Sequence, residues 1–176
     1  HYLKYIINEC NKITDVDVSK CDVKTVWTMW WQGIENMPPI VLACYNHLKK
    51  QCQDMRVVLI TENNWNEYIT IPEIIIEKFQ SGLLSITHFS DIIRVNLLKK
   101  WGGYWVDATM YIADLPNEIN EFDFFTLHAP NLFPNFISRG EWSPFFLGGN
   151  RNMCLMKNLC LLFYEYWKEH TELIDY

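Results

Sequence analysis

Residues 90–109 read SDIIRVNLLKKWGGYWVDAT, and this stretch decides how the fold is interpreted. Its first part has the apolar spacing of a helix, the pair Gly102-Gly103 stops that helix, and a short apolar strand ends at Asp107. Open α/β sheets bind ligands at the carboxyl ends of their strands. We therefore expect Asp107 to lie in a ligand-binding crevice.

Asp91 and Arg94 are three residues apart on the predicted helix, which places an acid and a base on one face. If exposed, such a pair stabilises a helix by only about 0.2–0.5 kcal/mol. The residues around it are mostly apolar, however, and charged groups buried among them need partners. The tight glycine turn sends the next strand back, so Asp107 is expected in the same crevice. Two carboxylates and a guanidinium suit a ligand with hydroxyls, phosphates and a metal ion.

The composition describes an acidic globular chain of 176 residues with a formal charge of −6. One domain, residues 1–176, is the simplest interpretation. Net acidity argues against a nucleic-acid partner. No apolar run reaches the ~20 residues of a membrane-spanning helix, so we expect no transmembrane segment in this chain and leave peripheral membrane association open.

The six cysteines form no C-x-x-C pair, and no histidine lies at a zinc-like spacing from them. Free thiols are the favoured interpretation, and they indicate a reducing compartment. We therefore expect a cytoplasmic protein, with the inner face of the membrane as an open alternative.

Strands alternate with helices, which predicts an α/β fold with a Rossmann-like, mostly parallel sheet flanked by helices. Thr87 is the expected N-cap of the long helix, and residues 128–143 are expected to loop over the site. The segment Gly148–Asn150 is interpreted as a turn, with a phosphate-binding loop as the weaker alternative. The last helix has no stop signal, so we expect an uncapped end and a truncated sequence. The predicted strands cover residues 23–29, 56–60, 104–107, 122–127 and 145–147; the predicted helices cover 4–10, 40–51, 62–68, 72–80, 87–100 and 152–167.

The motif S-D-x-x-R, followed by G-G-x-W-x-D, resembles the donor site of sugar-nucleotide glycosyltransferases with the GT-A fold. The similar groups are bacterial capsular polysaccharide synthesis proteins, yeast-type initiating mannosyltransferases and large clostridial glucosylating toxins. The capsular group is the most similar, because its members tend to have W-W-Q-G near the first strand and W-V-D-A-T at the metal strand. Both occur here, at residues 30–33 and 105–109. The resemblance runs roughly from Val23 to Trp167.

This resemblance implies transfer of a hexose, with retention, from a nucleotide-sugar donor to a surface or capsular glycan acceptor. It implies that Ser90, Asp91 and Arg94 contact the donor and that Trp31 stacks on its base. Asp107 would ligate a divalent cation, Mn²⁺ or Mg²⁺, at the diphosphate. Asp107, Asp91 and Arg94 are thus the catalytic candidates.

Two positions depart from the family pattern. Thr109 stands where the broader family has a second acid, although W-V-D-A-T is typical of the capsular group. It is the second metal-ligand candidate, through its hydroxyl or a water. Trp27 stands where the family often has a histidine, and Trp27 and Trp30 are interpreted as core aromatics.

Two other functions stay open. A non-catalytic module that binds sugar nucleotides or glycans would explain Thr109, and a sugar-phosphate transferase would use a similar donor site. His88 and His128 are interpreted as structural.

Overall fold

A five-stranded sheet in the order β2-β1-β3-β5-β4 forms the centre of the molecule. The computed structural model describes residues 2–13, 25–114, 123–128 and 139–172. Strands β1, β2 and β3 are parallel, whereas β5 runs antiparallel to both of its neighbours, β3 and β4. The predicted α/β class with a mostly parallel sheet is confirmed. The strands are β1 (Thr25–Met29), β2 (Arg56–Ile60), β3 (Gly103–Val106), β4 (Phe124–Thr126) and β5 (Phe146–Gly149).

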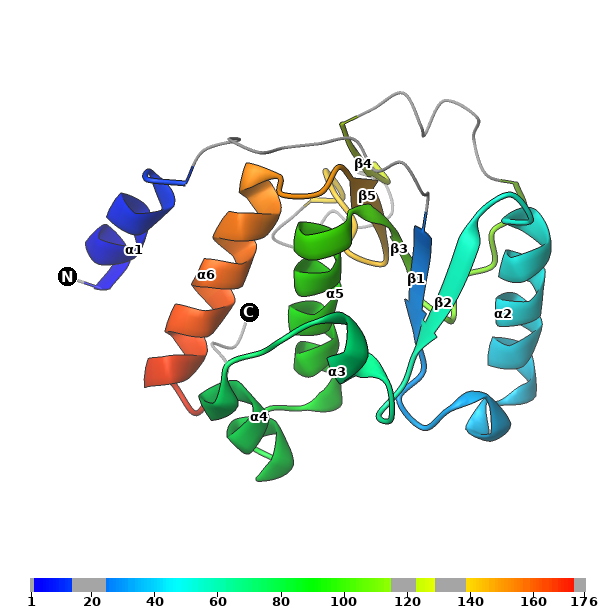
Figure 1. Ribbon diagram of the computed structural model, residues 1–176, viewed down its shortest axis with the longest axis horizontal. Coiled ribbons are helices and arrows are strands. Elements are labelled where there is room, and N and C mark those ends of the chain that lie inside the picture. Colours follow the sequence, from blue (N-terminus) through cyan, green and yellow to red (C-terminus); the bar gives the residue numbers. More distant parts are fainter. Residues whose placement is uncertain (1, 14–24, 115–122, 129–138, 173–176) are drawn as a thin grey trace.

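Helices cover both faces of the sheet (Figure 1). Helix α2 lies on one face, and α5 lies on the other, with α6 beside it and α1 outside α6. Within the described ranges, none of the helices combines the length and apolar character that a membrane span requires. The helices are α1 (Tyr2–Cys10), α2 (Pro39–Gln51), α3 (Trp65–Tyr68), α4 (Glu73–Gln80), α5 (Ile86–Trp101) and α6 (Cys154–Glu169), with a 3-10 turn, η1 (Ile34–Asn36).

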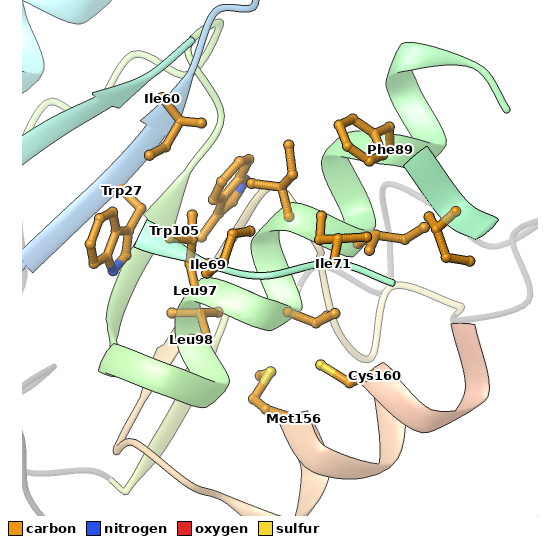
Figure 2. Packing of buried hydrophobic residues seen from close by; sticks show 14 of the residues in the cluster. Trp27, Ile60, Ile69, Ile71, Phe89, Leu97, Leu98, Trp105, Met156 and Cys160 are labelled. Atoms are coloured by element: carbon orange, nitrogen blue, oxygen red, sulfur yellow. The ribbon is translucent and has the colours of Figure 1, made fainter. Parts of the chain in front are cut away.

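Alternation along the strands divides the core between the two faces. Trp27 on β1 and Trp105 on β3 are register partners, and both pack toward α5 and α6 (Figure 2). Their neighbours Val26 and Tyr104 belong to a second cluster with Leu48 of α2. Because successive side chains on a strand point to opposite faces, this division follows from the pattern of the sequence.

Helix α5 is buried on nearly all sides, which explains its continuous apolar sequence. Ile92, Ile93, Leu97 and Leu98 are each at most 1% exposed. Fully burying one such side chain contributes roughly 1.5–3 kcal/mol. Packing therefore fixes α5 firmly against the sheet, and with it every polar side chain that α5 carries toward the strand ends.

The connection from α5 to β3 depends on Gly102 and Gly103, whose φ angles are +68° and +90°. L-residues with a side chain rarely adopt these values. A Cβ atom on Gly103 would also lie 2.2 Å from the carbonyl oxygen of Thr25 on β1. The predicted glycine stop is confirmed, and it lets β3 begin directly beside β1.

The interpretation of Gly148 and Gly149 as a turn is wrong, as is the phosphate-loop alternative. Both residues lie inside β5, where they pair with β3 on one side and β4 on the other. A Cβ atom on Gly148 would lie 2.3 Å from the ring of Tyr104. Close approach of neighbouring strands, rather than a turn, therefore requires glycine here.

Two predictions about helix ends are also wrong. The N-cap of α5 is Ser85, whose hydroxyl accepts from the backbone N–H of His88 at 3.4 Å, so Thr87 already lies inside the helix. The end of α6 is not uncapped, because the Lys78 ammonium of α4 donates to the carbonyls of Trp167 and His170. This cap comes from another helix and leaves no signal in the sequence of α6 itself.

Candidate functional site

A cavity of about 290 Å³ lies at the carboxyl ends of β1 and β3, beside the first turns of α5. Four predicted site residues line it: Trp31, Ser90, Asp107 and Thr109. The location agrees with the rule that parallel strands present ligand sites at their carboxyl ends. The remaining lining residues are Met29, Trp30, Gln32, Ile86, Thr87, Trp105 and Ala108.

Asp91, Arg94 and Asp107 form one connected ionic group. Nη1 of Arg94 donates to Oδ1 of Asp91 at 2.8 Å, and Nη2 donates to Oδ1 of Asp107 at 3.2 Å. The two carboxylates come from α5 and from the residue after β3, so the guanidinium joins the helix to the strand end. The predicted convergence of these three side chains is confirmed.

Burial differs sharply within this ionic group. The side chain of Arg94 is 7% exposed, whereas those of Asp91 and Asp107 are each 33% exposed. Nε of Arg94 is buried and has no hydrogen-bond partner among the described residues. Asp107 lines the cavity, but Asp91 and Arg94 do not, so the expectation that Asp91 lines it is wrong. Its carboxylate is held by Arg94 instead.

The environment of Asp91 changes its acidity. Burial raises the pKa of the Asp91 carboxyl above its ordinary value, and the nearby Asp107 carboxylate acts in the same direction. Arg94 and His88 act against this rise, because a positive charge favours the ionised carboxylate. Burial is the largest of these influences on the pKa of Asp91.

Trp105 is the main residue that sequence reasoning missed. Its indole N–H donates to Oδ1 of Asp107 at 2.5 Å, and the guanidinium carbon of Arg94 lies 4.9 Å from its ring centroid. The signal was present in the sequence, since Trp105 and Asp107 are two positions apart and residues so spaced on a strand share a face.

The tryptophans after β1 have different surroundings. Trp31 is half-buried, and the rings of Phe79 and Phe89 pack edge-to-face with it at 5.3 and 5.7 Å. Trp30 packs against a core cluster, in agreement with its interpretation as a core aromatic, and it also lines the cavity. Trp27 is 2% exposed and donates to the carbonyl of Gly102, which confirms its place in the core.

The two histidines interpreted as structural both have partners. Nδ1 of His88 lies 2.6 Å from the Ser85 hydroxyl, and Nε2 of His128 lies 3.3 Å from a carboxylate oxygen of Glu141.

The predicted loop over the site falls partly on residues 129–138, which lie outside the described part of the chain.

The donor atoms fit a divalent cation only if another group supplies most of its ligands. In the described residues, no three His, Cys, Asp or Glu side chains come together as metal ligands would. Asp107 offers Oδ2, which accepts no hydrogen bond from a described residue, and Thr109 lies exposed in the same cavity wall. Mg²⁺ is often held by one or two carboxylates together with substrate phosphates.

A family model described as "Capsular polysaccharide synthesis protein" matches residues 2–176.

The chain belongs to the capsular polysaccharide synthesis protein family. The resemblance noted from W-W-Q-G and W-V-D-A-T is thereby confirmed at the level of the family. In this member of the family, residues from both motifs line one cavity.

Two curated proteins are similar to part of this capsular polysaccharide synthesis family member. O-glycosyltransferase braB of Annulohypoxylon truncatum is 30% identical over 98 residues, 51% of this chain and 23% of that protein. O-glycosyltransferase PaGT of Phomopsis amygdali is 28% identical over 94 residues, 48% of this chain and 23% of that protein. The matched segment thus spans about a quarter of each relative's length. No solved structure is detectably similar to the chain.

Proposed function

We propose that this chain forms the donor-binding part of a glycosyltransferase that moves a hexose from a nucleotide sugar to a surface or capsular polysaccharide, with retention. The family and the two O-glycosyltransferase relatives support glycosyl transfer. The observation that carries the proposal is the cavity itself. It is lined on one side by the tryptophans that follow β1 and on the other by the Asp107 carboxylate after β3, which Arg94 and Trp105 hold in place.

The proposed donor lies across this cavity with its base toward β1. Trp31 would hold the base, since stacking of a base on an aromatic ring contributes about 1–3 kcal/mol in nucleic-acid sites. The diphosphate would lie toward Asp107, and Ser90 would contact the donor from α5. Asp91 and Arg94 would orient the sugar when the donor rearranges their present ion pair.

The proposed cation is Mn²⁺ or Mg²⁺, held by Oδ2 of Asp107, by Thr109 directly or through water, and by the donor's phosphates. When bound, such a cation would stabilise the negative charge that develops on the leaving diphosphate. The chain's own contribution is to fix one carboxylate. Arg94 and Trp105 both bond its Oδ1 and leave Oδ2 available. The proposed setting is the cytoplasm, at the inner face of the membrane.

The experiment measures binding and transfer separately. Calorimetry would titrate the protein with uridine, guanosine, adenosine and cytidine diphosphates, each with Mn²⁺ and with a chelator. A second assay would mix the protein with the corresponding nucleotide sugars and measure release of nucleoside diphosphate with and without a glycan acceptor. We expect binding of one diphosphate that requires the cation, and release that increases with the acceptor.

Other outcomes would decide among the functions considered. Equal affinity with Mn²⁺ and with chelator would refute the metal role. Cation-dependent binding without sugar transfer would favour a non-catalytic module of the same fold. Failure of all four diphosphates to bind would refute the proposed donor site.

A further inference from the structure

We propose that Trp105 is a positioning residue that fixes the orientation of the Asp107 carboxylate and of the Arg94 guanidinium at the same time. Its role toward a ligand rests on the proposed function, whereas its role toward Asp107 does not.

The geometry places Trp105 at the junction of the ionic group. Its indole N–H and Nη2 of Arg94 both donate to Oδ1 of Asp107, at 2.5 and 3.2 Å. The same indole ring lies 4.9 Å from the guanidinium carbon, within the range of a cation–π contact. One side chain therefore contacts both partners of the Arg94–Asp107 ion pair.

Burial makes Trp105 a rigid support. The residue is 1% exposed and belongs to the core cluster that β1 and β3 form with α5 and α6 (Figure 2). Its ring therefore cannot follow Asp107 if the carboxylate rotates. Hydrogen bonds to an ionised carboxylate are roughly twice as strong as neutral ones, so rotation away from the indole would be costly.

This arrangement determines which carboxylate oxygen of Asp107 can bind a ligand in the cavity. Two donors occupy Oδ1, and no described residue donates to Oδ2. A carboxylate held in this way presents one predetermined oxygen to the cavity that it lines. Groups that orient a metal-binding side chain typically matter about 10–100-fold in metal affinity.

The test compares Trp105→Phe with the matched control Trp27→Phe. Trp27 is the register partner of Trp105, is equally buried in the same cluster, and donates its indole N–H to the carbonyl of Gly102 rather than to Asp107. Both substitutions remove one indole N–H from the same core. Only Trp105→Phe removes a hydrogen bond to Asp107.

Binding of uridine and guanosine diphosphates with Mn²⁺ would be measured for the wild type, both variants, Asp107→Asn, and Asp107→Asn combined with each. We expect Trp105→Phe to weaken binding at least about tenfold and Trp27→Phe to change it less than about twofold. We also expect Trp105→Phe to have no further effect once Asp107 is asparagine, because a positioning residue acts through its partner. Wild-type affinity in Trp105→Phe, or an equal loss in the Asp107→Asn background, would overturn the proposal.

A spectroscopic arm needs neither ligand nor a tryptophan variant. Indole N–H resonances of ¹⁵N-labelled wild type and Asp107→Asn would be compared. We expect the Trp105 resonance to shift toward the position of a weaker hydrogen bond and that of Trp27 to stay. An unchanged Trp105 resonance would overturn the contact itself. A shifted resonance in a protein that binds none of the four nucleoside diphosphates would refute the proposed function while supporting the orientation of Asp107 by Trp105.

Discussion

Arg94 and Asp107 are 13 positions apart, yet Nη2 of the arginine lies 3.2 Å from Oδ1 of the aspartate. The glycine turn between α5 and β3 makes this contact possible, because it returns the chain directly along the helix. Arg94 is 6% exposed, so its charge depends on Asp107 and Asp91 for compensation. The glycine turn therefore determines two things at once: it brings Arg94 next to Asp107, and it provides the buried guanidinium with a compensating negative charge.

Replacing Arg94 by lysine should weaken nucleoside diphosphate binding by about tenfold. A single ammonium cannot contact two carboxylates with the fixed planar geometry of a guanidinium. The charge is kept, so the melting temperature should change little. Calorimetry and thermal unfolding would be run on the same samples. A sharp fall in melting temperature with unchanged affinity per folded molecule would show that Arg94 is purely structural.

Asp107→Asn should lower the rate of sugar transfer by about 10²–10³-fold, since it removes one charged contact to the transition state but almost no volume. Asp114→Asn is the control, because Asp114 is an exposed carboxylate on the same connection after β3. Initial rates of nucleoside diphosphate release would be compared at matched protein concentration. Activity of Asp107→Asn equal to that of the control would remove Asp107 from the site.

The stability of the protein should depend on Asp91 with a defined sign. Burial raises the pKa of its carboxyl above the ordinary 3.8, so the folded state holds this proton more tightly than the unfolded state does. The stabilising contribution is therefore present below about pH 3.8 and is lost as the pH rises through the raised pKa. Wild type should lose stability relative to Asp91→Asn as the pH rises above about 3.8, measured by urea unfolding. A relative gain over that range would mean that Arg94 outweighs burial.

Alanine substitutions at two glycines should separate steric overlap from backbone strain. Gly82 and Gly103 both have positive φ angles, +78° and +90°, but a Cβ atom meets nothing within 4 Å at Gly82. Gly82→Ala should therefore cost about 1–2 kcal/mol of unfolding free energy. Gly103→Ala, whose Cβ would lie 2.2 Å from the Thr25 carbonyl, should cost more than about 4 kcal/mol. Similar urea midpoints for the two variants would contradict this.

The thiols should react in the order of their burial. Cys52 and Cys160 are each 2% exposed, and burial raises the pKa of both to about 11. The reactive thiolate is thus scarce and shielded at these two positions. Iodoacetamide at about pH 8 should label Cys10 and Cys154, whose side chains are partly exposed, well before them. Mass spectrometry would follow each site, and the rates should converge in urea. Early labelling of Cys160 in native protein would contradict the packing of α6.

Local patterns predicted the parallel half of the fold well. Strand β2 occupies the predicted residues 56–60. A short apolar run between polar turns is too short for a helix and usually forms a buried strand. The Asp91–Arg94 contact also follows from sequence, since residues three apart on a helix are neighbours. The glycine stop before β3 was equally visible, because paired glycines end helices.

Contacts between segments far apart in the sequence could not be predicted from local patterns. Lys78 caps α6 from 89 positions away, and neither helix shows this in its own pattern. The local sequence predicts a turn at Gly148, since the Tyr104 ring that requires a glycine there comes from another strand. In the site, the sequence predicted which polar residues converge but not which of them face the cavity. The side-chain orientations decide this, and the hydrogen bonds of Arg94 to Asp91 and Asp107 fix those of the three charged residues.

Among the described residues, those that line the cavity all fall between Met29 and Thr109, and β4, β5 and α6 contribute none. The described part of the cavity wall thus comes from one continuous stretch of less than half the chain. Strand β5 and helix α6 support this wall from behind, since Trp105 pairs with Leu147 and shares a core cluster with Met156 of α6. A chimaera that exchanges only residues 29–109 would therefore exchange the whole described lining of the cavity.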